Sequence, residues 1–328
     1  MRLGRLARLL AGAWIGAALL AGCAHRAPLA GAQLAGLPAS VELTDTPFFP
    51  QERYQCGPAA LASVLSARGA AVTPEELVPQ VYLPARKGSL QAEIMATVRR
   101  RGLLTVPVEP SLDAVLAEIA AGHPVLVLQN LGLDWLPRWH YAVAIGYDLP
   151  QQVLILRSGT ERRRITPFGV FMNTWERSMR WGIVVLTPGS FPARAEPGAY
   201  LEAVSALEGV GKRAEAQAAY KASTERWPDS LVAWLGRGNA EYALGQAAHA
   251  EASFRQALQV QAGAGAAWNN LAYALAARQC IRAARQAARC AKRLSPGHAA
   301  FTHTLMEMDT LQAPGAGACL PLPACPAH

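Results

Sequence analysis

The sequence predicts an α+β domain followed by an all-α helical repeat, and three observations support this division. Between residues 42 and 188, helical patterns come first and strand patterns follow, an order typical of an α+β unit. Residues 189–198 are rich in proline and glycine, which indicates a linker. Beyond the linker the chain is rich in alanine, and aromatic residues recur every 34 positions.

The first 41 residues predict an exported, anchored protein. Three arginines precede an apolar run, residues 9–20, that is too short for a comfortable membrane span. Residues 20–23, Leu-Ala-Gly-Cys, resemble a bacterial lipobox, in which the signal is cleaved before a cysteine that carries lipid. We therefore assign residues 1–22 to a lipoprotein signal peptide, expect lipid on Cys23, and assign residues 23–41 to a tether. An ordinary secretory signal is the alternative.

The same segment sets the expected location. Ala24, rather than an aspartate, follows the cysteine, and in lipoproteins this favours the outer membrane. We expect a lipid-anchored protein of the bacterial cell envelope that faces the periplasm. No later apolar stretch is long enough to span a bilayer.

The basic residues do not indicate nucleic-acid binding. The formal charge of +8 falls to +5 without the three signal arginines. The only tight basic runs, residues 99–101 and 162–164, are typical of a solvated helix or hairpin face. We therefore expect no nucleic-acid partner.

Six cysteines divide into three groups. Cys23 is the expected lipid site, Cys56 lies in the α+β domain, and four lie near the C-terminus: Cys280, Cys290, Cys319 and Cys325. In an oxidising compartment these four favour two disulfides, and three pairings are open. No histidine accompanies them at ligand spacing, so we expect neither a metal nor another cofactor. Residues 313–328 form a Cys/Pro-rich tail that could be clamped onto the repeats.

The α+β domain, residues 42–188, is expected to contain these elements in order. A buried helix begins at the Cys56 segment, and Thr73-Pro74-Glu75-Glu76 predicts the N-terminus of a second helix. Gly102 ends a predicted helix over residues 89–101. The remaining elements are a helix over residues 111–121 and strands over residues 103–108, 124–128, 140–147, 152–156 and 181–186.

The second unit, residues 199–312, repeats with a period of 34. Trp234 and Trp268 share one register, and Tyr200 occupies the same position one repeat earlier. A helix–turn–helix period of this length, with alanines at the crossings, resembles tetratricopeptide repeats. Three repeats and a capping helix over residues 299–311 are expected, with a protein partner or peptide as ligand. A generic alanine-rich bundle is the alternative.

Cys56 is the candidate nucleophile of the first unit. It stands before Gly57 and Pro58, which fit the tight start of a helix. A thiol at a helix N-terminus faces unpaired N–H groups and the positive end of the dipole, which favour the thiolate. The alternative is a small, buried and inert side chain.

His140 is the candidate general base. The domain has two histidines, and His123 lies in a turn before a strand, whereas His140 begins a strand of apolar residues. A papain-like fold places its base at the start of such a strand, against the helix that carries the cysteine. A structural histidine is the alternative.

These residues together resemble a known family. Gln51, Cys56-Gly57-Pro58-Ala59-Ala60-Leu61 and His140-Tyr141-Ala142-Val143 are similar to the bacteriocin-processing, double-glycine leader peptidases, and most of all to stand-alone lipoprotein relatives with tetratricopeptide repeats. The resemblance implies a papain-like fold in which the cysteine attacks a peptide carbonyl and the histidine is the base. It also implies a glutamine in the oxyanion hole, which we carry over to Gln51, five residues before the cysteine.

The residue that orients His140 departs from the family pattern. Asp148 lies eight residues along the same strand, roughly 26 Å away, and we expect it in a hairpin turn. The returning strand then places Arg157, Ser158 or Gly159 opposite the histidine, where family members commonly carry an aspartate, and Ser158 is the candidate for orienting the imidazole. A serine can fix the tautomer of the imidazole but stabilises imidazolium less than a carboxylate does. Asn130 is the alternative orienting residue.

Three functions are compatible with these patterns. The first is an exported, lipid-anchored cysteine peptidase that hydrolyses a peptide bond through an acyl-enzyme, while its repeats bind a partner or substrate. The second is a catalytically weak or inactive peptidase-fold lipoprotein that acts as a scaffold through its repeats. The third keeps the cysteine chemistry for an amidase or acyltransferase reaction.

Overall fold

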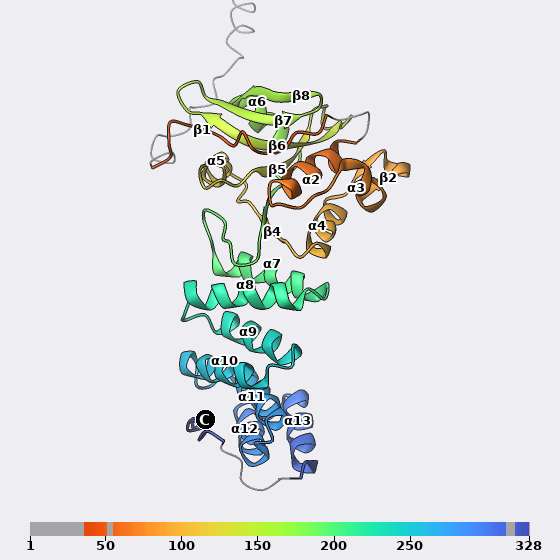
Figure 1. Cartoon of the computed structure of the whole chain (residues 1–328). Coiled ribbons are helices and arrows are strands. Elements are labelled where there is room, and N and C mark those ends of the chain that lie inside the picture. Colours follow the sequence, from red (N-terminus) through yellow and green to blue (C-terminus); the bar gives the residue numbers. More distant parts are fainter. Residues whose placement is uncertain (1–35, 51–54, 313–318, 328) are drawn as a thin grey trace, which may run out of the picture. The chain divides into compact units, whose positions relative to one another are not determined.

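The computed structural model describes residues 36–50, 55–312 and 319–327 of the chain (Figure 1). The expected signal peptide, the lipid site at Cys23 and the oxyanion residue Gln51 lie outside the described residues. Within the described ranges, no helix is both long enough and apolar enough to cross a bilayer.

An antiparallel sheet, with strands of different lengths, forms the centre of the first domain. The described residues give seven strands, in which β4, β9, β5, β6, β7 and β8 lie side by side in that order and β1 also pairs with β6. Their bounds are β1 (Ser40–Glu42), β4 (Leu104–Pro107), β5 (Val125–Asn130), β6 (Trp139–Asp148), β7 (Val153–Ser158), β8 (Glu161–Pro167) and β9 (Gly182–Leu186). Strand β1 takes in Ser40 and Val41, so the last two residues of the predicted tether belong to the sheet.

Helices cover both faces of this sheet. They are α2 (Cys56–Ser66), α3 (Pro74–Val81), α4 (Gln91–Arg100), α5 (Leu112–Ala120) and α6 (Phe168–Glu176), with a short hairpin of β2 (Tyr82–Leu83) and β3 (Gly88–Ser89) between α3 and α4. On one face, α2 packs against Leu128 of β5 and Val143 of β6 in the main apolar core. On the other, Gln129 of β5 donates a 2.6 Å hydrogen bond to Thr174 of α6. Alternation along β5 therefore separates the two helical layers.

Helix α2 is buried along almost its whole length, which fixes the position of its first residue. Every residue from Gly57 to Leu65 is buried. A Cβ atom at Gly57 would lie 2.3 Å from the hydroxyl oxygen of Ser89, so the missing side chain lets the β2–β3 hairpin approach the start of the helix. This tight packing holds Cys56 at one defined place beside the sheet.

Strand β8 and helix α6 are among the elements that have no counterpart in the sequence analysis. Strand β8 carries the Arg162–Arg164 run, and five of its seven residues are consecutive exposed positions. This edge strand does not show the alternation of polar and apolar residues that predicts a half-buried strand. Helix α6 follows it directly and buries only Phe168, Phe171 and Trp175.

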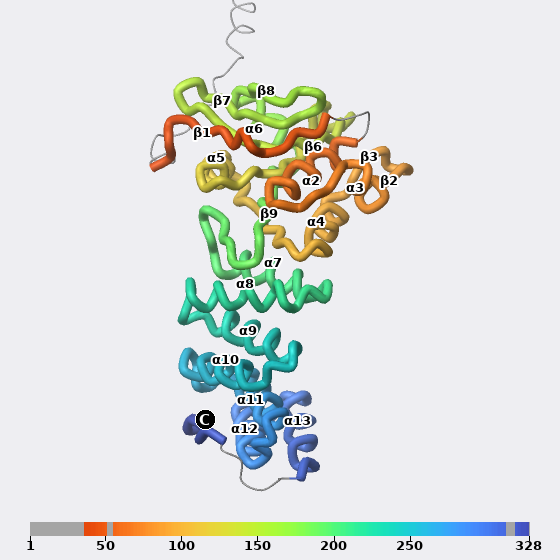
Figure 2. The backbone as a smooth tube through the Cα atoms, in the orientation of Figure 1, coloured from red at the N-terminus to blue at the C-terminus, as the bar shows by residue number. Residues whose placement is uncertain are grey.

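The second domain consists of helices that repeat in pairs (Figure 2). The first helix of each pair begins at residue 197, 231 or 265, and a final helix begins at residue 299, so each step is 34 residues. The helices are α7 (Pro197–Gly209), α8 (Arg213–Arg226), α9 (Leu231–Ala243), α10 (Ala247–Val260), α11 (Gly265–Ala277), α12 (Ile281–Leu294) and α13 (Ala299–Thr310). The predicted capping helix over residues 299–311 corresponds to α13.

Small residues allow the paired helices to cross closely. A Cβ atom at Gly238 of α9 would lie 2.5 Å from the Phe254 ring of α10, so only glycine fits there without a shift. The turns within the pairs use left-handed backbone: φ is +83° at Gly211, +76° at Gly245 and +62° at Gln279. The third turn therefore places a glutamine in a conformation that favours glycine.

Two disulfides fasten the C-terminal tail to the last repeat. Cys280 pairs with Cys319 and Cys290 with Cys325, each with a Cα–Cα distance of 5.8 Å. Arg255 of α10 adds hydrogen bonds of 3.1 and 2.8 Å to the carbonyls of residues 320 and 321. Of the three pairings that the sequence leaves open, the fold selects this one because it sets the distances between the cysteines.

Candidate active site

Cys56 is the first residue of α2 and carries a free thiol. The thiol is half-buried against the apolar core, and the backbone N–H groups of Tyr141 and Gly57 act on it to lower its pKa. Tyr141 follows His140 directly in β6, so one backbone contact brings the sulfur next to the strand position that carries the histidine. The tyrosine hydroxyl in turn donates to the carbonyl of Ser89 at 3.1 Å, which ties β6 to the hairpin beside α2.

His140 lies where β6 leaves the sheet. It stands opposite Gln129 of β5, while the pairing of β6 with β7 begins only at Val143. The edge of β6 on the β7 side is therefore unpaired at His140 and Tyr141. The Tyr141 backbone and the imidazole lie at this same end of the sheet.

Ser158 lies beside the imidazole. Its hydroxyl oxygen is 2.8 Å from Nε2 of His140, and Ser158 is the last residue of β7 and is buried. Because this contact uses Nε2, Nδ1 is the nitrogen that can take a proton from the thiol. The hairpin between β6 and β7 thus brings the predicted orienting residue to the histidine.

The other two orienting candidates are engaged elsewhere. The side-chain oxygen of Asn130 accepts the N–H groups of Gly132 and Arg138, each at 2.9 Å, and shapes the loop after β5. Asp148 accepts the N–H of Gln151 at 2.9 Å in the hairpin turn, as the sequence predicts. Asn130 is therefore not placed to orient His140.

Burial raises the pKa of the Cys56 thiol above its ordinary value, and this corrects the prediction of a thiolate favoured by the helix start. The loss of water around the sulfur is the largest cause. The hydrogen bonds from Tyr141, Gly57 and the backbone of Cys56 itself act in the opposite direction and do not compensate for it.

The environment also keeps His140 neutral. Burial, together with the positive charges of Arg164 and Arg138, lowers the pKa of His140 to about 4. At neutral pH both partners are therefore uncharged. The site therefore contains a protonated thiol and a neutral imidazole rather than a thiolate–imidazolium pair.

This protonation state predicts a defined pH response. The alkylation rate of Cys56 is expected to rise with pH through a single ionisation above the ordinary thiol pKa of 9.0. His140 is expected to stay neutral down to about pH 4, because its pKa in the folded protein is below the ordinary 6.5. Iodoacetamide kinetics and NMR titration of the imidazole measure the two groups. A plateau of reactive thiolate between pH 5 and 8 would contradict this assignment.

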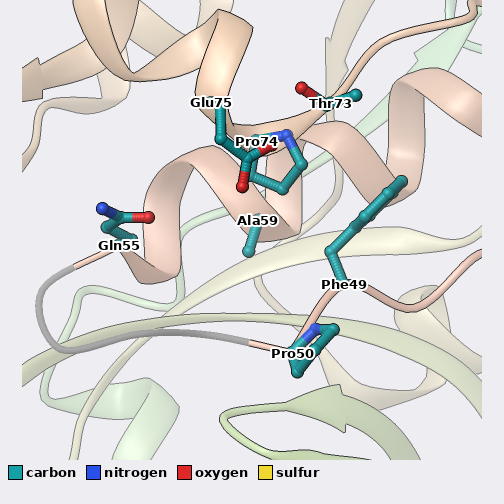
Figure 3. Close-up of a pocket in the computed structure, with 7 residues that line it drawn as sticks. All are labelled: Phe49, Pro50, Gln55, Ala59, Thr73, Pro74 and Glu75. Carbon is teal, nitrogen blue, oxygen red and sulfur yellow. The ribbon is translucent and has the colours of Figure 1, made fainter.

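A pocket of about 410 Å³ lies beside the start of α2 (Figure 3). Glu75 at the start of α3 and Phe49 in the segment after β1 stand on two sides of Ala59. The lining residues are Phe49, Pro50, Gln55, Ala59, Thr73, Pro74 and Glu75. Gln55 precedes Cys56 in the chain, and Cys56 itself is not among the lining residues.

The loop between β5 and β6 exposes an apolar surface next to His140, which the sequence analysis did not identify. Five large apolar side chains within nine positions are exposed by 43 to 78 %: Leu131, Leu133, Trp135, Leu136 and Trp139. Asn130 holds this loop in shape, and residues 133 and 136 bridge to each other. The sequence signal that could have indicated this surface is the presence of two tryptophans, Trp135 and Trp139, within five positions.

No metal site can be assigned in the described ranges. Within them, no three His, Cys, Asp or Glu side chains come together to hold an ion.

The family comparison matches the first domain. Residues 43–182 match the model of the family described as "Peptidase_C39 like family". The similarity to this family is confined to the N-terminal domain. The match spans less than half of the chain, and a comparison with curated proteins found no match.

Solved structures resemble one or the other part of the chain. A C39-like peptidase from Bacillus anthracis is 18 % identical, with 45 % of this chain and 98 % of that chain covered and a TM-score of 0.39. The peptidase domain of Streptococcus ComA is 19 % identical over 43 % of this chain and 98 % of that chain, with a TM-score of 0.34. The first tetratricopeptide-repeat domain of RPAP3, bound to an HSP90 peptide, is 21 % identical over 34 % and 90 %, with a TM-score of 0.33.

The predicted fold class is confirmed. The domain that matches the C39-like peptidase family comes first, and a region of helix pairs with a 34-residue period follows it.

Proposed function

We propose that the protein is a cysteine peptidase with Cys56 as nucleophile and His140 as general base. The observation that carries this proposal is the 2.8 Å contact between His140 and Ser158, in a domain that matches the C39-like peptidase family and whose free thiol, Cys56, begins α2 and packs against the same apolar core as Tyr141. A free thiol, a neutral imidazole and a group that orients it are the parts that acyl transfer by a cysteine requires.

The proposed reaction has two stages. The sulfur of Cys56 attacks the peptide carbonyl while Nδ1 of His140 takes the thiol proton. The resulting imidazolium returns that proton to the leaving amine, and a thioester with Cys56 remains. Water then attacks the thioester, again with His140 as base. Unpaired N–H groups at the start of α2, together with Gln51, would donate to the oxyanion.

Ser158 suits this neutral pair. Its hydroxyl can accept the N–H at Nε2 and so hold the tautomer in which Nδ1 is free to act as a base. It adds no negative charge to stabilise the imidazolium that forms during attack. We therefore expect slower turnover than a carboxylate in this position would give.

The apolar loop after β5 is proposed to receive bulky apolar side chains of the substrate peptide. Trp139 is adjacent to His140, and Trp135, 78 % exposed, is the most exposed side chain of this loop. Burying such a surface against a substrate side chain would be favourable, because apolar area is removed from water on both partners.

A peptide library tests both the function and this preference. Wild-type protein is expected to cleave a subset of peptides enriched in large apolar residues, as identified by mass spectrometry of the products. Trp135→Ala is expected to lower kcat/KM for those peptides about tenfold, and to leave peptides with small residues unchanged. Met179→Ala is the matched control, because Met179 is 87 % exposed in the same domain but lies after α6. An equal loss in both variants would contradict the subsite.

We further propose that the repeats bind a protein partner or a peptide. The first helices of successive repeats place Asn239 and Asn270 in contact at 2.8 Å. The neighbouring Asn269 has a buried side-chain oxygen with no hydrogen-bond partner in the described ranges. Side-chain amides can both donate to and accept from a peptide backbone, which supports this use of the surface.

The envelope location and the lipid on Cys23 complete the proposal. They rest on the sequence pattern of residues 1–23. Metabolic labelling with a fatty acid analogue, compared between wild type and Cys23→Ser, tests them directly.

A further inference from the structure

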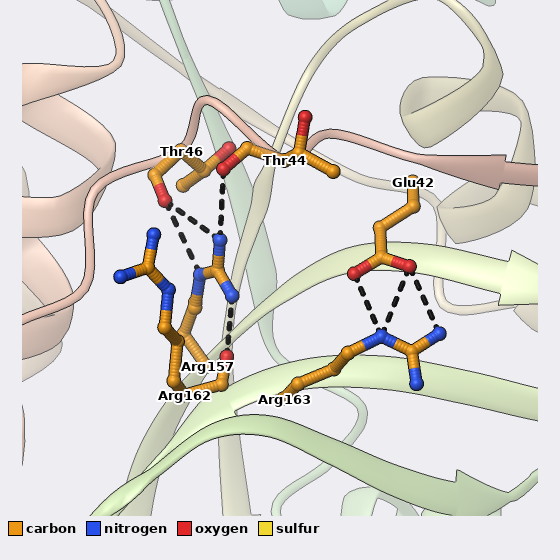
Figure 4. Close-up of polar contacts among 6 residues, drawn as sticks. All are labelled: Glu42, Thr44, Thr46, Arg157, Arg162 and Arg163. Carbon is orange, nitrogen blue, oxygen red and sulfur yellow. Dashed lines mark hydrogen bonds and ion pairs between the residues drawn. The ribbon is translucent and has the colours of Figure 1, made fainter.

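Arg157, the residue before Ser158, is a buried arginine that binds backbone carbonyls. It is 5 % exposed, and its guanidinium donates to the carbonyls of Thr44 at 3.0 Å and of Thr46 at 3.0 and 3.2 Å. It also donates to the carbonyl of Arg162 in β8 (Figure 4). Neither an ion pair nor a hydrogen bond joins it to a carboxylate among the described residues.

These bonds hold the segment that leads toward the nucleophile. Residues 44–46 follow β1 and continue to Phe49 and Pro50, which line the pocket beside α2. Phe49 and Cys56 pack against the same apolar core. Arg157 is more than 100 positions away in sequence, so this attachment exists only in the folded domain.

The same dipeptide also reaches the general base. Adjacent residues of a strand point to opposite sides, so Arg157 can hold the segment after β1 while Ser158 contacts His140. The pairing of β7 with β8 shifts register between residues 156 and 158, so this end of β7 contains a β-bulge or a similar irregularity. Two neighbouring residues thus connect the pocket wall and the imidazole.

Burial of the Arg157 guanidinium costs solvation free energy. Burial lowers the pKa of Arg157, and the nearby charge of Arg162 lowers it further. Neutral carbonyls compensate for lost water less well than a carboxylate does. The planar guanidinium has several N–H donors in a fixed arrangement, and here they reach three carbonyls from two separate segments. The ammonium group of a lysine does not have this donor geometry.

We propose that Arg157 is a positioning residue of the active site, which fixes the pocket wall at residues 44–50 relative to α2 and to Ser158. This inference rests on the proposed function, because the aligned groups are those that would perform hydrolysis. Arg157 does not touch the reacting atoms. Its effect is transmitted through Phe49 and Pro50 on one side and through Ser158 on the other.

Arg163 provides a matched control. Its guanidinium binds the Glu42 carboxylate at 2.9 and 3.1 Å, so it also links β8 to the segment around β1. It is exposed, its partner is an acid, and the bond ends at Glu42, outside the pocket wall. The two arginines therefore differ in burial and in what they hold, but have the same charge.

The test compares Arg157→Met, Arg157→Lys and Arg163→Met in the full chain. With a peptide that the wild type cleaves, Arg157→Met is expected to lower kcat about 100-fold, because small displacements of reacting groups have effects of this size. Arg157→Lys is expected to recover only part of this loss, and Arg163→Met to stay within about twofold of wild type. If Arg157→Met does not fold, the comparison of kcat between Arg157→Lys and the wild type tests the inference.

Alkylation of Cys56 supplies a readout that does not need turnover. A displaced wall admits water to the thiol, so its pKa should move toward the ordinary value and the iodoacetamide rate at pH 7.5 should rise about three- to tenfold in the Arg157 variants. Folded Arg157 variants with wild-type kcat and a wild-type alkylation profile would overturn the inference, as would an equal response of Arg163→Met. Absence of hydrolysis in the wild type would instead refute the proposed function, while the alkylation comparison would still test Arg157.

Discussion

Alanine at Cys56 is expected to lower kcat/KM for peptide hydrolysis by a factor of about 10⁴ or more, since the covalent route is lost with the nucleophile. His140→Ala is expected to cause a loss of similar size. The double variant should be no worse than either single one, because the two side chains act as one unit. Single-turnover and steady-state kinetics on a cleaved peptide measure these effects.

Two controls separate catalysis from folding. The thiol is half-buried and small, so Cys56→Ala should leave the circular dichroism spectrum and the melting temperature of the protein close to those of the wild type. Ser158→Ala should have a smaller effect than loss of the base, because the hydroxyl only holds the imidazole. Strictly additive effects of the Cys56 and His140 changes would contradict a working pair.

Loss of either disulfide is expected to lower the free energy of unfolding of the repeat domain by about 3 to 4 kcal/mol, because the bonds close loops of 39 and 35 residues. The bonds connect the tail to α12 and its preceding turn, so their loss enlarges the unfolded ensemble and releases residues 319–327. Guanidinium unfolding followed by circular dichroism, with and without reductant, measures the change.

A Cys56→Ser background keeps this experiment clear of disulfide exchange, because Cys56 is the free cysteine among the described residues. Within it, Cys290→Ser/Cys325→Ser removes one bond, and Cys280→Ser/Cys319→Ser removes the other. The loops overlap, so the combined loss should be less than the sum of the two. Equal unfolding midpoints in oxidised and reduced protein would mean that the tail contributes nothing to stability.

Much of the candidate site follows from local patterns. The Cys56-Gly57-Pro58 segment predicts a helix start because glycine and proline have narrow roles there, and α2 begins at Cys56. The hairpin after β6 predicts that Ser158 returns to His140, and the two side chains are in contact. The roles of these residues in catalysis stay predictions.

Other features depend on contacts between distant segments. Strand β1 is three residues long and is stabilised by its pairing with β6, so its own sequence gives little signal. Strand β8 is exposed at the sheet edge and therefore lacks the alternation that predicts strands. Arg157 finds its acceptors in segments that sequence order does not connect.

The sequence by itself determined the helix that begins with the cysteine, the strand that begins with the histidine, and the 34-residue period of the second domain. These are properties of neighbouring residues, set by backbone geometry over one or two turns. The tertiary structure alone decided the disulfide pairing, the exposure of the loop after β5 and the neutral state of Cys56 and His140. The disulfide pairing depends on the distances between the cysteines, and the protonation states depend on the water and charges around each group. Packing of distant segments sets both the distances and the environment.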